Sequence, residues 1–463
     1  MVTTRNEADV FEGGSKKTDK TIDLEIASLA LPTLATLAAD PLASLVATAY
    51  IGHLGSVQLA SVGIALSVFN TVTRLFNMPL LSVTTSTVAT AVGTTKGDSA
   101  GVGVASSTAL LLGLLVGLSE AAVLTAVAGA GLALWGVPVG SPMRVDALDF
   151  LLIRAWGAPA TVLLLVVQGV FRGLGDTRTP LYATVACNLL NIFLNPLFIF
   201  TLGWGVRGSA SATILSELAA ALGLVLALTR RCNLRLTGKA ALQDAAKFLG
   251  PTGLLAIRTV AISGTFALAT ALAARSGSAH AAAHQICLQL WLASSLLADS
   301  LAVAAQSLMA RSLAGSDRDT ARKVVARTIR LGGLLGVILS GALALGSGVL
   351  PGVFSRDPSV LAVVAVIWPW VVLTQPITAL AFVWDGVLYG ANGFQYAAKA
   401  MAVCAAPAML CMLLGLWAPI TTPDVRLTAV WLGLAVLMGM RALTIYLPYK
   451  RQSAPFDRLF ERP

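Results

Sequence analysis

Long apolar runs alternate with short polar segments along almost the whole chain. A helix that spans a membrane needs about 20 consecutive, mostly apolar residues. Twelve runs meet this requirement, and glycine, proline or charged residues separate them. The predicted spans cover residues 24–51, 58–92, 102–134, 148–171, 181–202, 208–229, 248–274, 280–310, 329–350, 361–388, 396–418 and 427–449. The pattern therefore predicts an all-α polytopic membrane protein, with tilted or irregular ends where a run is long.

The composition supports a lipid environment. Of 463 residues, 56% are hydrophobic and 12% are charged, whereas soluble domains carry about 25% charged residues. A soluble protein with so few charges could not cover its surface with polar groups. The lipid bilayer must therefore be the main partner of this chain. The net charge is +10, but the basic residues form short clusters between apolar runs. Because these clusters do not form a single basic patch of the kind that binds nucleic acid, we predict no nucleic-acid partner.

The distribution of basic residues predicts the orientation. If the connecting segments are assigned alternately to two sides, 23 of the 32 lysines and arginines share the side of the N-terminus and 5 lie opposite. Cytoplasmic segments carry such an excess of positive charge. We therefore expect an even number of spans and two cytoplasmic termini.

The two halves of the sequence resemble each other. Pro32-Thr33 and Pro251-Thr252 each open a span, at an offset of 219 residues. The segments 171–175 and 388–392 match at an offset of 217 residues. This near-constant offset predicts two six-helix lobes related by a pseudo-twofold axis along the membrane normal. The predicted units are a cytoplasmic tail (1–23), an N-lobe (24–229), a cytoplasmic linker (230–247), a C-lobe (248–449) and a second tail (450–463).

Five carboxylates lie well inside the predicted spans: Asp40, Glu120, Glu217, Asp299 and Asp385. A charge near the bilayer centre costs roughly 3 kcal/mol, so such residues either serve function or hold helices together. Asp40 is the leading candidate for a proton or cation site. Pro41 follows it and has no N–H, so the carbonyl of Leu37 loses its helical bond and a helix break is expected. Asp299 and Asp385 are its counterparts in the second half.

Other polar residues recur at helical spacing. Asn188, Asn191 and Asn195 form one stripe, which either lines a polar path or bonds to a neighbouring helix. Asn70, Arg74 and Asn77 form another, in which the arginine either neutralises a buried carboxylate or binds an anionic substrate. Gln289 and Trp384 lie on the helices of Asp299 and Asp385. For Arg154 we favour a side chain that reaches the headgroup region, and for Arg258 this is the alternative to a role in the site.

The sequence contains no Walker A loop, no GxGxxG motif after a strand and no HExxH motif. An ATP-driven pump would need nucleotide-binding machinery, and an intramembrane enzyme would need paired catalytic residues. The five cysteines have no metal-type spacing. We predict a secondary transporter that is not an enzyme and uses no cofactor beyond a coupling ion, H⁺ or Na⁺.

Several motifs resemble one known family. They are DPL at 40–42, AYIGHLG at 49–55, LFNMPLL at 75–81, QGVFRG at 168–173, DTRTP at 176–180, AHQI at 283–286, LLAD at 296–299, TQP at 374–376 and AFVWDG at 381–386. In combination they resemble the multidrug and toxic compound extrusion (MATE) family, and within it the DinF-like branch of plants and algae. The resemblance covers nearly all of residues 24–450.

The resemblance implies a V-shaped pair of lobes that exports organic solutes in exchange for H⁺ or Na⁺. Asp40 occupies the position of the aspartate that takes the coupling proton in prokaryotic members of this branch. Asn191 matches an asparagine of the family, but Asn195 replaces an acid, which leaves Asp40 as the principal coupling residue. Plant members include exporters of citrate and phenolic acids, and the basic residues Arg74, Arg172 and Arg258 make an anionic substrate plausible.

We therefore predict a proton-coupled antiporter for a small organic anion or amphipathic metabolite, acting as a monomer. The alternatives are a lipid-linked precursor flippase of related fold and a Na⁺-coupled multidrug cation exporter. The plasma membrane is the first expected location and the plastid envelope the second. The predicted coupling residues are Asp40, Asn191, Asn195, Asp299 and Asp385, and the predicted substrate contacts are Asn70, Arg74, Asn77, Asn188, Gln289 and Trp384.

Overall fold

The computed structural model describes residues 18–94, 99–135, 137–234, 238–417 and 422–460. Within these ranges the regular structure is entirely helical. The helices are α1 (Asp19–Gly52), α2 (Ser56–Thr94), α3 (Ser99–Leu134), α4 (Arg144–Leu174), α5 (Arg178–Pro196), α6 (Gly205–Thr229), α7 (Gly238–Arg275), α8 (Ser278–Ala314), α9 (Arg318–Leu345), α10 (Leu350–Phe354), α11 (Pro358–Leu373), α12 (Gln375–Gly390), α13 (Phe394–Trp417), α14 (Pro423–Lys450) and α15 (Asp457–Phe460).

Twelve membrane spans are present if one bent pair counts as a single span. Eleven helices of the described chain are long and apolar enough to cross a membrane, and α11 and α12 together form the twelfth. These two helices meet at Thr374 with a bend of 46°. Pro376 lies in the first turn of α12 and has no N–H, so the helical hydrogen bonds of α11 cannot continue through it. The predicted all-α polytopic fold is confirmed.

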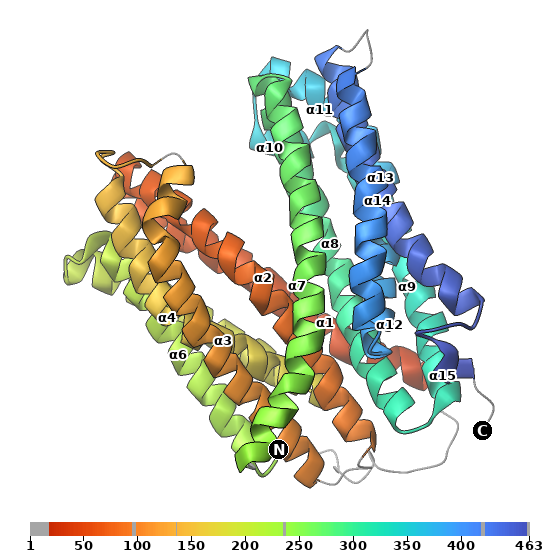
Figure 1. Cartoon of the computed structure of the whole chain (residues 1–463). Helices are drawn as coiled ribbons and strands as arrows, with labels where there is room; N and C mark the ends of the chain where they lie inside the picture. Colours follow the sequence, from red (N-terminus) through yellow and green to blue (C-terminus); the bar gives the residue numbers. More distant parts are fainter. Residues whose placement is uncertain (1–17, 95–98, 136, 235–237, 418–421, 461–463) are drawn as a thin grey trace, which may run out of the picture.

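The helices form two lobes that diverge from a common narrow end (Figure 1). Equivalent helices pack on each other in both: α3 against α4 and α9 against α12, α1 against α5 and α7 against α13. The two GxxxG motifs show the same repetition. A Cβ atom on Gly117 would lie 2.5 Å from Cα of Pro159, and one on Gly336 would lie 2.5 Å from Cα of Pro376. Only glycine allows these two backbones to approach so closely.

The lobes contact each other through α1 and α2 on one side and α7 and α8 on the other. At the narrow end, Nε2 of Gln306 donates to the carbonyl of Ser82 at 2.7 Å and to Oγ of Ser86 at 2.8 Å. Oγ of Ser86 in turn donates to the carbonyl of Tyr389 at 2.9 Å. We call these hydrogen bonds between α2, α8 and α12 the seam.

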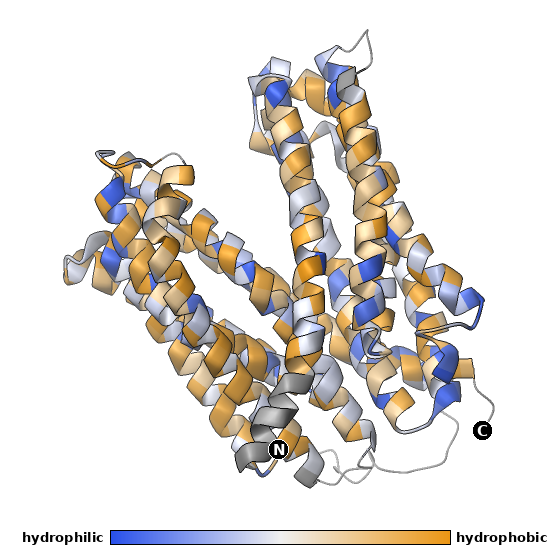
Figure 2. Cartoon of the chain, viewed as in Figure 1, coloured by the Kyte–Doolittle hydropathy of each residue, from blue (hydrophilic) through white to orange (hydrophobic). Residues whose placement is uncertain are grey.

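Polar residues gather mainly near the helix ends, while apolar residues cover most of the helix lengths (Figure 2). This distribution is the one that a bilayer around the middle of the helices requires. Two helices begin ten or more residues earlier than expected, because their first turns are too polar for a hydropathy pattern to include them. Helix α9 begins at Arg318 instead of residue 329, where Oδ1 of Asp317 caps the N–H of Thr320 at 3.0 Å. Helix α7 begins at Gly238, inside the predicted linker 230–247.

The prolines act differently from one helix to another. The break that we expected at Pro41 is absent, because α1 is continuous from Asp19 to Gly52. In α5, by contrast, the α-helix ends at Pro196 and a π-helical turn follows at Leu197–Thr201. Because proline has no N–H, both Pro41 and Pro196 leave one carbonyl without its helical hydrogen bond. Only at Pro196 does the backbone change from an α-helix to a π-helical turn.

Candidate functional site

Asp40 on α1, the principal predicted coupling residue, forms a hydrogen bond with Asn188 on α5. Nδ2 of Asn188 donates to Oδ1 of Asp40 at 3.1 Å. The Asp40 side chain is exposed and Asn188 is partly buried. Helix α1 also packs against α8 of the other lobe, so Asp40 lies on a helix that both lobes contact. An exposed carboxylate with one amide partner can gain or lose a proton without breaking a buried ion pair.

The other two asparagines of α5 point into the N-lobe instead. Asn191 and Asn195 are 8% and 0% exposed. Nδ2 of Asn191 donates to Oγ1 of Thr213 on α6 at 3.1 Å, and Nδ2 of Asn195 donates to Oδ1 of Asn191 at 3.0 Å. The predicted polar stripe therefore divides. Asn188 bonds to Asp40 on α1, whereas Asn191 bonds to α6 and Asn195 bonds to Asn191. Oδ1 of Asn195 has no hydrogen-bond partner among the described residues.

Arg172 connects Asp40 with the second lobe electrostatically. Its side chain, at the end of α4, is 6% exposed and interacts with the charges of both Asp40 and Asp299. Asp299 is partly buried on α8 and also interacts with the charge of Arg441. The backbone carbonyl of Arg172 accepts a hydrogen bond of 2.8 Å from Oγ of Ser307, which fixes α4 to α8. A change of charge on Asp40 therefore alters the electrostatic environment of Arg172, where α4 contacts α8 of the other lobe.

Helix α2 carries the exposed polar face that we predicted around Arg74. Ser67, Asn70, Thr71 and Arg74 are all exposed and recur at helical spacing. Within the described part of the chain, Arg74 forms no ion pair. A guanidinium keeps its charge at physiological pH, so this face requires water or an anion and is unsuited to lipid.

Asn77 does not share that exposure, contrary to our expectation of one common face. It is 6% exposed, and its Oδ1 has no partner in the described structure. The reason is its depth, because Leu80, Val83 and the following residues of α2 are buried where the two lobes converge. On α8, the predicted Gln289 is exposed, as is Gln285 one turn earlier. The exposed polar residues of α2 and α8 are thus the candidate substrate contacts.

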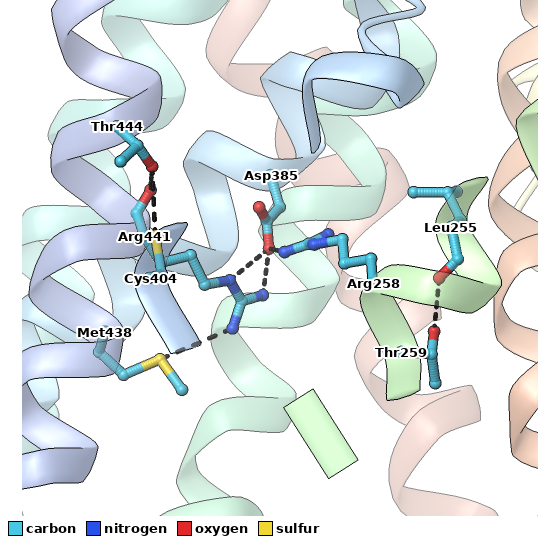
Figure 3. A network of polar contacts seen from close by, with 8 residues as sticks. All are labelled: Leu255, Arg258, Thr259, Asp385, Cys404, Met438, Arg441 and Thr444. Atoms are coloured by element: carbon cyan, nitrogen blue, oxygen red, sulfur yellow. Dashed lines mark hydrogen bonds and ion pairs between the residues drawn. The ribbon is translucent and has the colours of Figure 1, made fainter. Parts of the chain in front are cut away.

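Trp384 and Asp385 lie in the interior of the C-lobe, away from those exposed faces. Trp384 is 4% exposed and packs edge-on against Tyr446 and Tyr449 of α14. We therefore do not retain it as a substrate contact. Oδ2 of Asp385 accepts hydrogen bonds from Nη2 of Arg258 at 2.6 Å and from Nε of Arg441 at 2.6 Å (Figure 3).

These contacts leave Asp385 without the freedom that we predicted for a coupling residue. Asp385 is 5% exposed, Arg258 is 4% exposed and Arg441 is 8% exposed. The arrangement is a buried ion-pair cluster between α7, α12 and α14, and Arg258 does not reach toward the headgroups. Removal of one partner from such a cluster leaves an uncompensated buried charge, so the cluster at least fixes the three helices together.

A second buried ion pair lies in the N-lobe. Nη1 of Arg154 on α4 lies 3.1 Å from Oε1 of Glu217 on α6, and Oγ1 of Thr161 donates to Oε2 of Glu217 at 2.5 Å. Arg154 is 6% exposed, and its guanidinium lies 4.6 Å from the centre of the Phe69 ring. The prediction that Arg154 reaches the membrane surface is therefore wrong. Sequence spacing could not reveal this pair, because 63 positions separate its members.

Glu120, the remaining carboxylate, is neither exposed like Asp40 nor ion-paired in the described structure like Glu217 and Asp385. It is 1% exposed on α3, and both of its carboxylate oxygens lack a hydrogen-bond partner in the described structure. An ionised carboxylate in such a place would be very costly, so the group is held neutral.

Comparisons with known proteins agree with this architecture. The family model MatE matches residues 32–197 and 255–413, one stretch in each lobe. Protein DETOXIFICATION 44, chloroplastic, from Arabidopsis thaliana is 40% identical over 449 residues, which cover 96% of this chain and 85% of that protein. Protein DETOXIFICATION 45, chloroplastic, from the same plant is 39% identical over 437 residues, covering 91% and 77%.

The fold also matches solved structures. The crystal structure of the Vibrio cholerae MATE transporter VcmN in the bent form superposes with a TM-score of 0.85. The alignment covers 96% of this chain and 99% of that chain at 18% identity. At so low an identity, the likeness concerns the fold and not the chemistry of the site.

Proposed function

Because the chain belongs to the MATE family, we propose that it is a secondary antiporter that exports an organic anion or amphipathic metabolite in exchange for H⁺. The observation that carries the substrate sign is Arg74, an exposed guanidinium without an ion-pair partner in the described structure. Asn70 lies one turn away on the same exposed face and adds neutral hydrogen-bonding capacity. A fixed positive charge there attracts carboxylates and repels organic cations.

The coupling proton is assigned to Asp40. Protonation removes its negative charge and with it the attraction between Asp40 and Arg172. Arg172 then interacts more strongly with its other acidic neighbour, Asp299 on α8. Since α4 and α8 belong to different lobes, loading of a proton changes the balance of charges at the point where the lobes meet. An antiporter needs such a link between ion binding and the arrangement of its lobes.

We further propose that the protein resides in the plastid envelope. Two relatives that are 40% and 39% identical are named as chloroplastic. A sequence likeness of this extent outweighs our expectation of the plasma membrane, which rested on no specific motif. Imaging of a fluorescent fusion, with the fluorophore at the C-terminus, tests the location. A signal confined to the plasma membrane would refute it.

Transport itself is tested in proteoliposomes with purified protein. The screen uses citrate, salicylate and an ethidium-like cation as substrates, each with and without a pH gradient. We expect counterflow of at least one of the two carboxylates and its acceleration by the pH gradient. Transport of the cation alone would overturn the proposed substrate class. Acceleration by a Na⁺ gradient but not by a pH gradient would overturn the proposed coupling ion.

A further inference from the structure

The ion-pair cluster of the C-lobe borders a small, partly open pocket. The cavity has a volume of about 10 Å³. Its wall is formed by α7, α12, α13 and α14, with the lining residues Arg258, Asp385, Leu388, Ala397, Ala400, Met401, Cys404, Arg441, Thr444 and Ile445. A space of this size holds about one water-sized particle. The site proposed above for substrate and proton uses none of its polar residues.

Two guanidiniums converge on one carboxylate oxygen beside this cavity (Figure 3). Each arginine has five N–H donors in its guanidinium, yet Arg258 and Arg441 both direct theirs to the same oxygen, Oδ2 of Asp385. Nε of Arg258 is buried without a partner in the described structure. Nη1 of Arg441 contacts only the sulfur of Met438, at 3.6 Å, which is a weak acceptor.

The charges are unequal as well. Two guanidiniums share one carboxylate, so the cluster has a surplus of one positive charge. All three side chains are almost completely buried, and an unpaired charge in such surroundings is costly. Asp299 also interacts with the charge of Arg441, but Arg172 attracts it too. The cluster thus lacks one negative charge, while Oδ1 of Asp385 is also buried without a hydrogen-bond partner in the described structure.

We propose that this pocket binds one anion between Arg258 and Arg441. The ligand presents a single negative charge to both guanidiniums, either as a halide ion or as the carboxylate end of an organic anion. A halide is the smaller of the two ligands and requires the least widening of the cavity. A carboxylate enters only when Asp385 moves aside, because both would compete for the same N–H donors. The halide form is independent of the proposed transport function, whereas the carboxylate form rests on it.

Ligand binding to the folded state raises the unfolding temperature, which gives a test without transport. The purified protein is heated in detergent at constant ionic strength, with chloride titrated against isethionate, an anion too bulky for the cavity. We expect a saturable rise in Tm with chloride. Arg441→Met should abolish this rise, while the control Arg207→Gln, which removes an exposed arginine at the outer rim, should keep it.

A second variant covers the case in which Arg441→Met fails to fold. Asp385→Asn removes the resident charge and increases the positive surplus, so it should lower the apparent Kd for chloride at least tenfold. Bromide soaked into crystals should give an anomalous peak between Arg258 and Arg441. The proposal is wrong if chloride raises the Tm of wild type and Arg441→Met equally. It is also wrong if neither bromide nor chloride binds to wild type or Asp385→Asn.

The same titration with acetate and citrate separates the two ligand sources. A Tm rise with chloride alone assigns the pocket to an inorganic anion, and competition between citrate and chloride assigns it to the substrate carboxylate. Failure of transport in proteoliposomes would leave the chloride result unchanged, so the two proposals fail independently.

Discussion

The side-chain amide of Asn188 donates a hydrogen bond of 3.1 Å to the Asp40 carboxylate, which joins α5 to α1. The geometry leaves Asp40 exposed, in contrast to the ion-paired Glu217 and Asp385 and the enclosed Glu120. Among the acids within the described spans, a group with one neutral partner and access to solvent is best suited to exchange a proton with each cycle. We therefore assign the coupling proton to Asp40, whereas Glu217 and Asp385 are held in ion pairs.

Replacement of Asp40 by asparagine should abolish transport driven by a pH gradient. The asparagine oxygen still accepts the Asn188 hydrogen bond, so the protein should insert and fold as before. Uptake into proteoliposomes measures the first effect, and thermal unfolding measures the second. Asp149→Asn is the matched control, because Asp149 pairs with the exposed Arg207 near the outer end of its helix. Normal pH-driven uptake by the Asp40 variant would refute its assigned role.

The pair Arg154–Glu217 should act as a structural unit. Glu217→Met leaves Arg154 buried without its carboxylate and should destabilise the fold by about 3–5 kcal/mol. The double variant Arg154→Met with Glu217→Met removes both charges and should recover most of that loss. Chemical unfolding of the three proteins in detergent provides the comparison. If the double variant were no more stable than Glu217→Met alone, the coupling between the two residues would be absent.

Sequence patterns predict the features of this protein that depend on residues close together in the chain, and they miss contacts between residues far apart in it. Hydropathy and the near-constant offset between the halves predict the spans and the lobes, because each span is a local property of the chain. Pairings such as Arg258 with Asp385 join residues 127 positions apart, and no spacing rule reveals them. Helical spacing correctly grouped Asn70 with Arg74. It also grouped Asn77 with them, because spacing along one helix does not indicate where a second lobe covers it.

Gly93 lies where α2 and α8 of the two lobes approach each other closely. A Cβ atom there would clash with the backbone carbonyl of Arg311 and lie 2.7 Å from Cβ of Ala314, both on α8. Gly93→Ala should therefore push α2 away from α8 and weaken the seam. Gly63→Ala on the same helix is the control, since nothing lies within 4 Å of the added atom.

The effect of Gly93→Ala is read by spin labels placed on the ends of α2 and α8. We expect a longer distance or a broader distribution for Gly93→Ala and no change for Gly63→Ala. Gln306→Ala should act in the same direction, because it removes two hydrogen bonds between the lobes. Unchanged distances in both variants would show that the seam does not hold the lobes together.

Glu120 should behave as a neutral residue. Glu120→Gln retains its shape without a titratable proton and should leave both pH-driven transport and Tm close to wild type. Glu120→Leu replaces unpartnered polar atoms in a buried place and should be neutral or stabilising. Thermal unfolding and proteoliposome uptake measure the two effects. Loss of pH-driven transport in Glu120→Gln would instead make Glu120 a second proton carrier.

The sign of the substrate charge depends on Arg74. Its guanidinium is exposed on α2 and has no ion-pair partner in the described structure, so its charge is available to a ligand and contributes little to holding the fold. Arg74→Ala should raise the KM for a transported carboxylate by at least tenfold, the loss of roughly one charge-assisted hydrogen bond. The Tm should change little. Arg74→Lys keeps the charge but loses the planar guanidinium, so its KM should lie between those of wild type and Arg74→Ala.

Arg207→Ala serves as the control for Arg74, because it also removes an exposed arginine, yet one paired with Asp149. It should leave the KM unchanged and so exclude an effect of total charge. The same variants assayed with an organic cation sharpen the test. A fixed positive charge raises the entry barrier for a cation, so Arg74→Ala should improve any residual cation transport while it impairs that of the anion. Equal losses for both substrates would mean that Arg74 supports the fold or the lobe movement and does not select the charge of the substrate.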